Sequence, residues 1–261
     1  MVWRTARRLD AALAGRVLTL ADLRWPSLAT SDLTGLTVRE VVAAGKHLLT
    51  RMDADDRRPP LTLHSHLRMD GSWHVHRTGE RWRNPRPADG VRAALANEEW
   101  TAIGHDLGML DLVATDDEHT LVGHLGPDVL GATWDANEVR RHLEATPDRH
   151  IGEALMDQRV LAGVGTFFMA ESLFLRGFTP WTAVRDAGDL DALLDLLQRL
   201  LTANAARAVQ STTGDLRPKR TQWVHARAGL PCRRCGTTVR VAPIGVEPRT
   251  RPAFWCPRCQ R

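Results

Sequence analysis

Apolar residues near the start of the chain follow a helical period. They are Val2, Ala6, Leu9 and Leu13, and arginines occupy the faces between them. This spacing predicts an amphipathic helix, and Gly15 is a natural residue to end it. No Ser, Thr, Asp or Asn precedes Val2 as an N-terminal cap. We therefore expect that a segment is missing ahead of this helix.

The pattern changes to short β-type runs between about residues 15 and 130. These runs are His47–Met52, Leu61–His66, Trp73–Arg77, Trp100–Ile103 and Met109–Ala114. Turn-rich segments separate them, and two of these, Asp53–Pro60 and Arg81–Gly90, are predicted to be surface loops. Several short strands joined in this way favour a β-sandwich or a flattened barrel.

After residues 126–128 the pattern becomes helical. Asp135–Glu138 has the form of an N-terminal cap, and Val139 and Leu143 begin an apolar stripe behind it. Three further helices are predicted, at Ile151–Asp157, at Phe167–Arg176 and over the leucine-rich stretch from Leu190 to Leu201. A glycine turn at residues 161–165 joins the first two of these, and residues 211–222 are polar, basic and irregular, as expected of a linker.

Two Cys-x-x-Cys motifs near the C-terminal end hold all the cysteines of the chain. They are Cys232, Cys235, Cys256 and Cys259. Two such pairs at this separation are typical of a structural zinc site, because each pair forms a tight turn and the residues between form a hairpin. A redox dithiol would need a βαβ unit beside it, and two disulfides would need a secreted chain. A closed four-thiolate site leaves no position for substrate, so the metal is expected to hold the hairpin in shape.

The predicted hairpin is rich in arginine. The arginines are Arg233, Arg234, Arg240, Arg249, Arg251, Arg258 and Arg261, and Phe254 and Trp255 lie among them. Guanidinium groups interleaved with aromatic rings suit contacts to phosphates and bases. The net charge is only +4 with a sequence pI near 9.3, which indicates a local basic face and nucleic acid as the partner. A solvated basic tail is the alternative.

Length and composition limit the class of protein. A chain of 261 residues with 43% hydrophobic residues can form one large or two ordinary domains with a buried core. No apolar run approaches membrane-spanning length, and no signal-peptide pattern opens the chain. We therefore expect a cytoplasmic protein, in a compartment where reduced thiols are available to a metal.

Taken together, these motifs resemble the formamidopyrimidine-DNA glycosylase and endonuclease VIII (Fpg/Nei) family of base-excision repair enzymes, most closely its actinobacterial Nei-like branch. The strongest matching segments are Val224–Cys232, Arg251–Gln260 and Asp157–Gly165, and weaker ones are Gly45–Thr50, Ser65–Trp73 and Leu125–Asp128. All six occur in family order and extend over nearly the whole chain. Their order is more specific than any single segment.

The resemblance implies an α+β multidomain fold in three parts. These are an N-terminal helix and β-sandwich over residues 1–130, a helix-two-turn-helix domain with its linker over 131–222, and a four-cysteine zinc finger over 223–261. It also implies one structural zinc ion, damaged duplex DNA as the partner, and a monomer that holds the DNA between two lobes.

The resemblance further implies roles for individual residues. Gly165 and Thr166 would receive a DNA phosphate at a helix start, where backbone N–H groups are unpaired, and Arg251 would grip phosphates beside the lesion. Arg68 and Met69 would fill the space left by a flipped-out nucleotide. Lys46 would contact the sugar-phosphate and assist proton transfer as a catalytic residue. The alternatives are a core methionine at Met69 and a solvated lysine at Lys46.

Two positions depart from the family pattern. Thr166 stands where the family usually has asparagine, which predicts weaker DNA affinity. Family members also begin Pro-Glu-Gly-Asp-Thr directly before a helix like Val2–Leu9, whereas only Met1 stands there in this chain. The family proline attacks the sugar as a secondary amine and the glutamate acts as general acid. We expect this chain as written to be severely impaired, with weak lyase activity from its own α-amine.

The sequence thus predicts a bifunctional DNA glycosylase and apurinic/apyrimidinic lyase, with oxidised pyrimidines favoured over oxidised purines. A zinc-containing protein that binds lesions without cutting DNA is the alternative. A third hypothesis is a histidine metal site, because His64 and His66 share one strand face and His74 and His76 share another.

Overall fold

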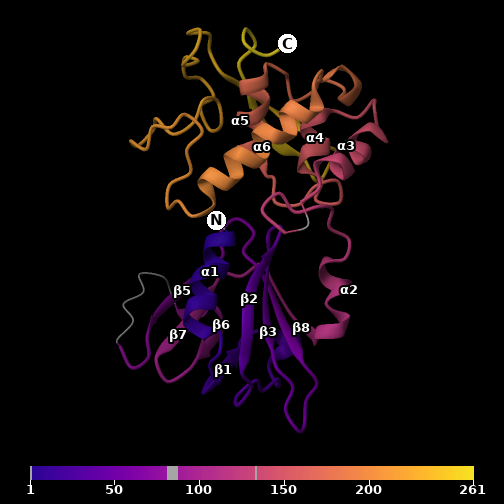
Figure 1. The fold of residues 1–261 in the computed structure, drawn as a ribbon. Coiled ribbons are helices and arrows are strands. Elements are labelled where there is room, and N and C mark those ends of the chain that lie inside the picture. Colours follow the sequence, from indigo (N-terminus) through magenta and orange to yellow (C-terminus); the bar gives the residue numbers. More distant parts are fainter. Residues whose placement is uncertain (1, 81–87, 133) are drawn as a thin grey trace. The chain divides into compact units, whose positions relative to one another are not determined.

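The computed structural model describes residues 2–80, 88–132 and 134–261, and it divides into two compact units. Unit 1 is Met1–His124 and unit 2 is Leu125–Arg261, coloured from indigo to magenta and from pink to yellow in Figure 1. The position of Met1 and residues 81–87 of the predicted loop Arg81–Gly90 lie outside the described residues. The division into three functional parts remains a prediction.

Unit 1 is a β-sandwich with one long helix, α1 (Val2–Leu13). Its strands are β1 (Leu20–Leu23), β2 (Val38–Ala44), β3 (His47–Met52), β4 (Leu61–His66), β5 (Ser72–Arg77), β6 (Val91–Ala96), β7 (Trp100–His105) and β8 (Met109–Ala114). In the described part of the unit one sheet has the order β1-β6-β7-β5 and the other β2-β3-β4-β8, with neighbours antiparallel. The predicted sandwich and the first helix are confirmed.

Three strands, β1, β2 and β6, were not singled out from the sequence. β1 has four residues, and β6 contains three alanines in six positions, so neither carries a strong β-type signal. β6 lies between β1 and β7 in its sheet and depends on both partners. β2 instead pairs with β3 across a tight turn, and its three valines are a local β-type signal that the sequence analysis did not use. Local propensity therefore failed for the short strand β1 and the alanine-rich strand β6, which depend on their partners in the sheet.

The core of unit 1 joins α1 to both sheets. Ala6, Leu9 and Leu13 lie in one cluster with apolar residues of the strands, and Leu9 and Leu13 are 2% and 0% exposed. Each fully buried leucine contributes about 1.5–3 kcal/mol to stability. Asp10, on a different face of the helix, accepts the backbone N–H of Val41 at 2.8 Å, which fixes α1 against β2.

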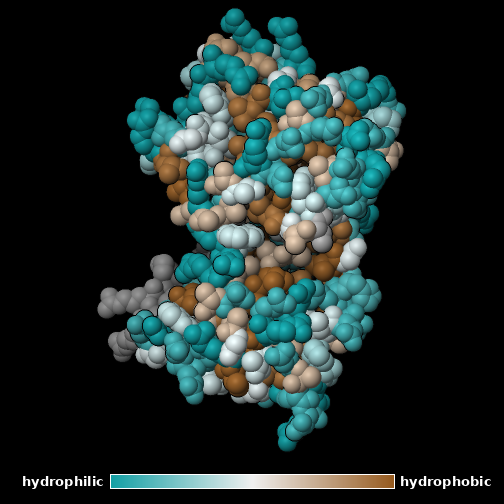
Figure 2. Space-filling model, viewed as in Figure 1, coloured by the Kyte–Doolittle hydropathy of each residue, from teal (hydrophilic) through white to brown (hydrophobic). Residues whose placement is uncertain are grey.

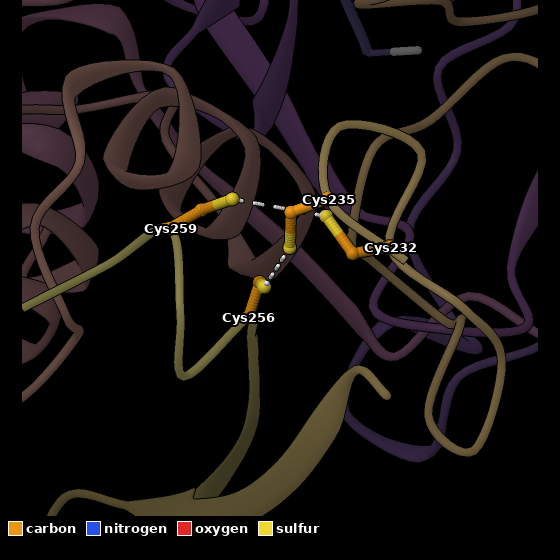
Figure 3. A group of neighbouring side chains, drawn as sticks. All are labelled: Cys232, Cys235, Cys256 and Cys259. Carbon is orange, nitrogen blue, oxygen red and sulfur yellow. Dashed lines mark hydrogen bonds between the residues drawn. The ribbon is translucent and has the colours of Figure 1, made fainter. Parts of the chain in front are cut away.

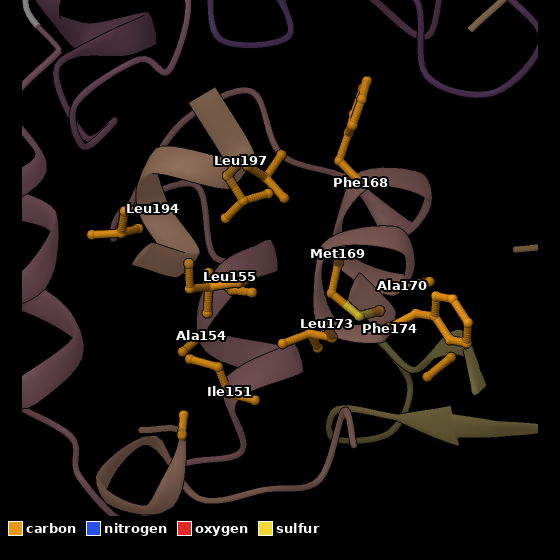
Figure 4. Close-up of a cluster of buried hydrophobic side chains, with 14 of the residues drawn as sticks. Ile151, Ala154, Leu155, Phe168, Met169, Ala170, Leu173, Phe174, Leu194 and Leu197 are labelled. Atoms are coloured by element: carbon orange, nitrogen blue, oxygen red, sulfur yellow. The ribbon is translucent and has the colours of Figure 1, made fainter. Parts of the chain in front are cut away.

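Unit 2 packs four helices around one apolar core. They are α3 (Ala136–Glu144), α4 (Ile151–Met156), α5 (Thr166–Arg176) and α6 (Leu190–Ala205). Asp135 caps α3 and Asp189 caps α6 through backbone N–H groups, which confirms the predicted cap at Asp135. Figure 4 shows Leu155 of α4, Leu173 of α5 and Leu197 of α6 converging in this core, where each is fully buried.

The C-terminal part of unit 2 is a hairpin of β9 (Arg240–Ile244) and β10 (Arg251–Trp255). Its buried residues Val239, Ile244 and Ala253 belong to the same apolar cluster as the helices. The hairpin is therefore a packed part of unit 2. This rules out the alternative that these residues form a solvated tail.

Short turns complete the described structure. One α-helical turn is α2 (His119–Val122) in unit 1, and 3-10 turns occur at Pro26–Leu28, Ala88–Gly90, Thr115–Asp117 and Val184–Asp186. The predicted loop Asp53–Pro60 joins β3 to β4. On the face drawn in Figure 2, hydrophilic residues cover most of each unit and apolar residues appear in patches. Among the described helices, none has the length and apolar character needed to cross a bilayer.

Candidate functional site

Lys46 lies in the tight turn between β2 and β3. Gly45 takes a positive φ of 57° there, and Ala44 pairs with His47 to close the hairpin. The Asp10 carboxylate accepts a hydrogen bond from the backbone N–H of Val41. Just past the helix end, the backbone N–H of Gly15 donates to the Val38 carbonyl at 2.8 Å. α1 therefore runs opposite to β2, and its first residues, about 12 Å beyond Asp10 at 1.5 Å per residue, point toward the Lys46 end of the sheet.

A second turn, at Arg68 and Met69, lies at this same end because His66 pairs with His47. The backbone N–H of Gly71 bonds to the carbonyl of Leu67 at 2.9 Å, and Arg68 takes a φ of 48°. A Cβ at position 71 would lie 2.4 Å from the Leu67 carbonyl oxygen, so the turn requires glycine there.

Met69 projects from this turn into solvent. It is 92% exposed, the highest value among the exposed large hydrophobic residues of the described chain. Met69 is therefore not a core methionine. A constrained turn that presents one apolar side chain to solvent gives the unit a rigid apolar tip.

The outer face of the β2-β3-β4-β8 sheet carries a row of polar side chains that the sequence analysis did not assemble. Strand alternation places His47 and Arg51 of β3, His64 of β4 and Asp111 of β8 on this face. His47 Nδ1 lies 2.8 Å from His64 Nε2, and His64 Nδ1 lies 2.9 Å from an Asp111 carboxylate oxygen. Farther along the face, Arg51 makes two bonds to Glu118, at 2.8 and 2.5 Å.

His66 of β4 lies on this same face, opposite His47. Burial and neighbouring positive groups keep both His47 and His66 neutral. Burial, followed by repulsion from other histidines and from Lys46, lowers the pKa of His47 to about 3. Burial, followed by His64, Lys46 and Arg68, lowers the pKa of His66 to about 4. His47 and His66, two half-buried imidazoles at the Lys46 end of the sheet, are therefore uncharged at neutral pH.

The histidine metal site predicted as a third hypothesis does not form within the described residues. Both ring nitrogens of His64 are occupied, by His47 and Asp111. His76 Nδ1 bonds to the Thr101 carbonyl at 3.1 Å. Among the described residues the four cysteines are the group of His, Cys, Asp and Glu that is close enough to share an ion.

Gly165 and Thr166 form the start of α5 in unit 2. Gly165 is the N-terminal flanking residue and no side chain caps this helix end, unlike those of α3 and α6. The amide of Gln158 braces the preceding turn, because it donates to Val164 at 3.0 Å and accepts from Gly163 at 3.1 Å. A braced, uncapped helix start of this kind favours an anionic ligand.

Glu171 of α5 is a second brace that the sequence did not reveal. The residue is fully buried, and its carboxylate accepts the backbone N–H groups of Trp223, Val224 and His225 at 2.7, 2.9 and 2.8 Å. The Thr212 hydroxyl also donates to it. This carboxylate therefore ties the segment that leads into the cysteine hairpin to helix α5.

The four cysteine sulfurs converge on one point (Figure 3). Their Sγ atoms all lie within 4.8 Å of one another, with 4.0 Å between Cys232 and Cys259 and 3.5 Å between Cys235 and Cys256. The residues come from two turns that flank β9 and β10, and all are unpaired thiols. Hydrogen bonds from Thr237 lower the pKa of Cys235 to about 6, whereas burial raises the pKa of Cys259 to about 12. The donor set fits one metal ion.

The arginines of the hairpin lie on its surface. All seven that the sequence analysis named are exposed. Arg251 begins β10 opposite Ile244, next to the connection between the strands, and its guanidinium donates to the Thr250 carbonyl at 3.2 Å. Arg234 stacks 4.4 Å over the ring of Phe174 of α5. Unit 2 thus combines a basic hairpin surface with the uncapped start of α5.

Comparison with known proteins identifies the class. Residues 2–106 match the formamidopyrimidine-DNA glycosylase N-terminal domain family. "Probable endonuclease 8 2" of Streptomyces coelicolor is 50% identical over 99% of this chain and 92% of its own length. "DNA-(apurinic or apyrimidinic site) lyase Nei2" of Mycolicibacterium smegmatis is 39% identical over 99% of this chain and 96% of its own length.

Solved structures share the fold at lower identity. A Lactococcus lactis Fpg variant in complex with Fapy-dG-containing DNA has a TM-score of 0.79 and 22% identity, covering 100% of this chain and 98% of that one. A complex of the Lactococcus lactis enzyme with DNA containing an abasic site has a TM-score of 0.76 and 21% identity, covering 100% of this chain and 98% of that one. The full-length relatives show that the chain belongs to the Fpg/Nei family, in its actinobacterial endonuclease VIII-like branch.

Proposed function

We propose that this protein is a bifunctional DNA glycosylase and abasic-site lyase of base-excision repair. The observation that carries the proposal is the match along nearly the whole chain to relatives named as endonuclease 8 and as abasic-site lyase. The proposed substrate is damaged duplex DNA, with oxidised pyrimidines favoured over oxidised purines. The proposed location is the cytoplasm, where unpaired thiols remain available to a metal.

The geometry of unit 1 supports a role at the damaged nucleotide. The first residues of α1, the Lys46 turn and the Arg68–Met69 turn all lie at one end of the sandwich. In this proposal Met69 enters the DNA stack and Lys46 contacts the sugar-phosphate. Unstacking a base costs a few kcal/mol, and an apolar wedge offsets part of that cost.

The proposed reaction uses an α-amine at the end of the chain that leads into α1. The amine attacks the anomeric carbon of the sugar, the glycosidic bond breaks, and an imine forms between protein and sugar. An α-amine suits this step because its pKa of about 7.7–8.0 leaves a neutral fraction at physiological pH. The imine acidifies the adjacent C–H, and loss of that proton expels the 3′ phosphate. Lys46 assists these proton transfers.

Unit 2 would hold the DNA backbone. The uncapped start of α5 at Gly165 and Thr166 offers backbone N–H groups to one phosphate, and Arg251 offers a guanidinium to phosphates beside the lesion. Thr166 would donate its hydroxyl to that phosphate. Both elements belong to one compact unit, which supports their joint binding of the DNA backbone. The protein is proposed to act as a monomer.

Zinc is the metal proposed for the cysteine cluster. Tetrahedral zinc with bonds of about 2.3 Å sets its sulfur ligands about 3.8 Å apart. The sulfur–sulfur distances of 3.5 Å between Cys235 and Cys256 and 4.0 Å between Cys232 and Cys259 lie on either side of that value. The ion would hold Cys232, Cys235, Cys256 and Cys259 together and so fix the arginine hairpin. Its role is structural.

A binding and cleavage assay tests the proposal. Duplexes carrying an abasic site, an oxidised pyrimidine or an oxidised purine are compared with intact duplex. We expect preferential binding to the abasic duplex. We expect strand cleavage at the lesion by a version carrying Pro-Glu-Gly-Asp-Thr ahead of Val2, faster at the pyrimidine than at the purine. Lesion-selective binding without cleavage, by this chain and by one carrying Pro-Glu-Gly-Asp-Thr ahead of Val2, would favour the non-catalytic alternative.

A further inference from the structure

Three arginines form a stripe along one side of helix α1. Arg4, Arg7 and Arg8 are spaced by three and four residues, which places them next to one another on the helix surface. Leu9 and Leu13 lie on the opposite side, in the core of unit 1. Arg7 and Arg8 are exposed, and Arg4 is partly exposed. The α1 stripe, as we call these three arginines, therefore faces solvent.

The described structure provides no acidic partner for the α1 stripe. Within the described residues, none of its three arginines forms an ion pair with Asp or Glu. Asp10 is the one acid of the helix, and its carboxylate already accepts the backbone N–H of Val41. Elsewhere in unit 1, by contrast, the exposed arginine Arg24 bonds to Asp22 at 2.9 Å. The positive charge of the stripe is therefore left to solvent.

These charges oppose the helix that carries them. Like charges three and four residues apart on a helix repel one another. A local conflict of this kind, with no compensating contact inside the protein, is expected where a ligand supplies the compensation. A polyanion that lies along the helix would replace the repulsion by attraction to all three guanidinium groups.

One member of the stripe also has an aromatic support. The guanidinium carbon of Arg7 lies 5.7 Å from the centroid of the Trp3 ring, one turn earlier in the helix. An arginine held over a ring still presents its N–H donors along the edge of the guanidinium plane. Such donors match the oxygens of a phosphate group.

The α1 stripe begins at the end of the sandwich that carries the Lys46 turn and the Arg68–Met69 turn. Because α1 runs opposite to β2, Arg4 is the arginine of the stripe nearest to that end. Arg8 lies about 6 Å farther along the helix, at 1.5 Å per residue. A strand of duplex DNA rises about 3.4 Å per nucleotide. The length of the stripe therefore matches about two consecutive phosphates.

We propose that the α1 stripe is a second phosphate-binding surface of unit 1, which contacts the duplex arm on one side of the lesion. This proposal rests on the proposed function, in which Lys46 and Met69 act at the damaged nucleotide. DNA is favoured over an acidic protein as the partner because the stripe begins at the end of the unit where those two turns lie. Contacts of this kind add affinity at every sequence and read no bases.

The salt dependence of binding tests the proposal. Each neutralised phosphate contributes about 0.9 to the slope of log affinity against log salt. In fluorescence anisotropy with an abasic duplex, across about 50–200 mM salt, the double variant Arg7→Gln/Arg8→Gln should lower that slope by about 1 to 2. Arg24→Gln, at the arginine paired with Asp22, is the matched control and should leave the slope unchanged. An unchanged slope in the double variant would overturn the proposal and favour an acidic protein as the partner.

Urea denaturation separates this role from a structural one. Glutamine is as good a helix former as arginine, and the double variant removes repulsion between neighbouring charges. Its denaturation midpoint should therefore equal or exceed that of the wild-type protein while its DNA affinity falls. A lower midpoint that accompanies the loss of affinity would show that these arginines support the fold, and it would contradict a binding role.

Duplexes with arms of different length locate the contact. One arm beside the abasic site is shortened at a time, and the wild-type protein is compared with the double variant on each duplex. The difference in affinity between the two proteins should vanish when one of the arms is cut short and persist when the other is. A difference that persists after both arms are shortened would show that the stripe does not contact a flanking arm.

The same titrations distinguish this inference from the function on which it rests. If the wild-type chain prefers the abasic duplex to an intact duplex but the double variant keeps the same salt slope, the stripe proposal is wrong while the function stands. If the wild-type chain binds both duplexes equally and the double variant still lowers the slope, the lesion-directed function fails and the stripe is retained as a DNA-binding surface.

Discussion

At the tip of the Arg68–Met69 turn, an apolar side chain is 92% exposed. Because Met69 contributes almost no buried area, Met69→Ala should change the free energy of unfolding by less than about 0.5 kcal/mol. It should weaken binding to abasic duplex, where the side chain would replace lost stacking. Fluorescence anisotropy and urea denaturation measure the two effects. Val17→Ala, at a half-exposed apolar residue of unit 1, should leave binding unchanged. Equal loss of binding in both variants would contradict the wedge role.

The neutral state of His47 makes the stability of unit 1 depend on pH. The pKa of His47 is lowered to about 3 in the folded protein, against about 6.5 in the unfolded chain. Between these values the unfolded chain binds the extra proton, so stability falls as pH falls from about 6.5 toward 3. In His47→Gln this part of the pH dependence should disappear. Urea denaturation from pH 7 to 4 measures it, and His119→Gln, at an exposed histidine, is the control.

Helix α5 shows how one buried carboxylate organises a whole element. Glu171 accepts three backbone N–H groups from residues 223–225. Glu171→Gln replaces two acceptor oxygens by one and places an NH2 group against a backbone donor. It should destabilise unit 2 by about 2 kcal/mol or more. Hydrogen exchange should show faster exchange at residues 223–225, with β3 and β4 unchanged; unchanged exchange at 223–225 would contradict this account.

The elements that the sequence predicted are those with local signals. The stripe of Leu9 and Leu13, the cap at Asp135 and the paired Cys-x-x-Cys motifs all act through residues close in sequence. The strands β1 and β6 were missed because their pairing depends on partners elsewhere in the sheet. The braces at Gln158 and Glu171 were missed because a single polar residue in an apolar stretch gives no periodic signal.

Residues of the candidate site that lie in short motifs were predicted from the sequence, whereas contacts between different strands were not. Lys46, Met69 and Arg251 came from a resemblance in short motifs, and the structure adds that Lys46 and Met69 lie on two turns at one end of the sandwich. The period of two correctly placed His64 and His66 on one face of a strand. It could not show that His64 pairs with His47 and Asp111 on two other strands, because strand register is set by tertiary contacts.

For the whole molecule, metal removal should affect the two units differently. Cys232 and Cys256 belong to the apolar cluster of unit 2, whereas the described core of unit 1 consists of residues before Ala114. A chelator should therefore increase hydrogen exchange over residues 228–261, with unit 1 unchanged. Cys256→Ser should reproduce this loss without chelator. Because buried thiols must release protons to bind the ion, retention of metal should weaken as pH falls. Unchanged exchange in the hairpin after full metal removal would contradict a structural role.

The central claim is imine chemistry on damaged DNA, and borohydride trapping on a duplex with one abasic site tests it most directly. The assay compares this chain with one carrying Pro-Glu-Gly-Asp-Thr ahead of Val2, processed so that proline is first, and binding is measured in parallel. We predict efficient trapping by the extended chain, with peptide mapping placing the adduct on its terminal amine. Binding by both versions with no adduct from either would contradict the account and leave a lesion-binding protein in its place.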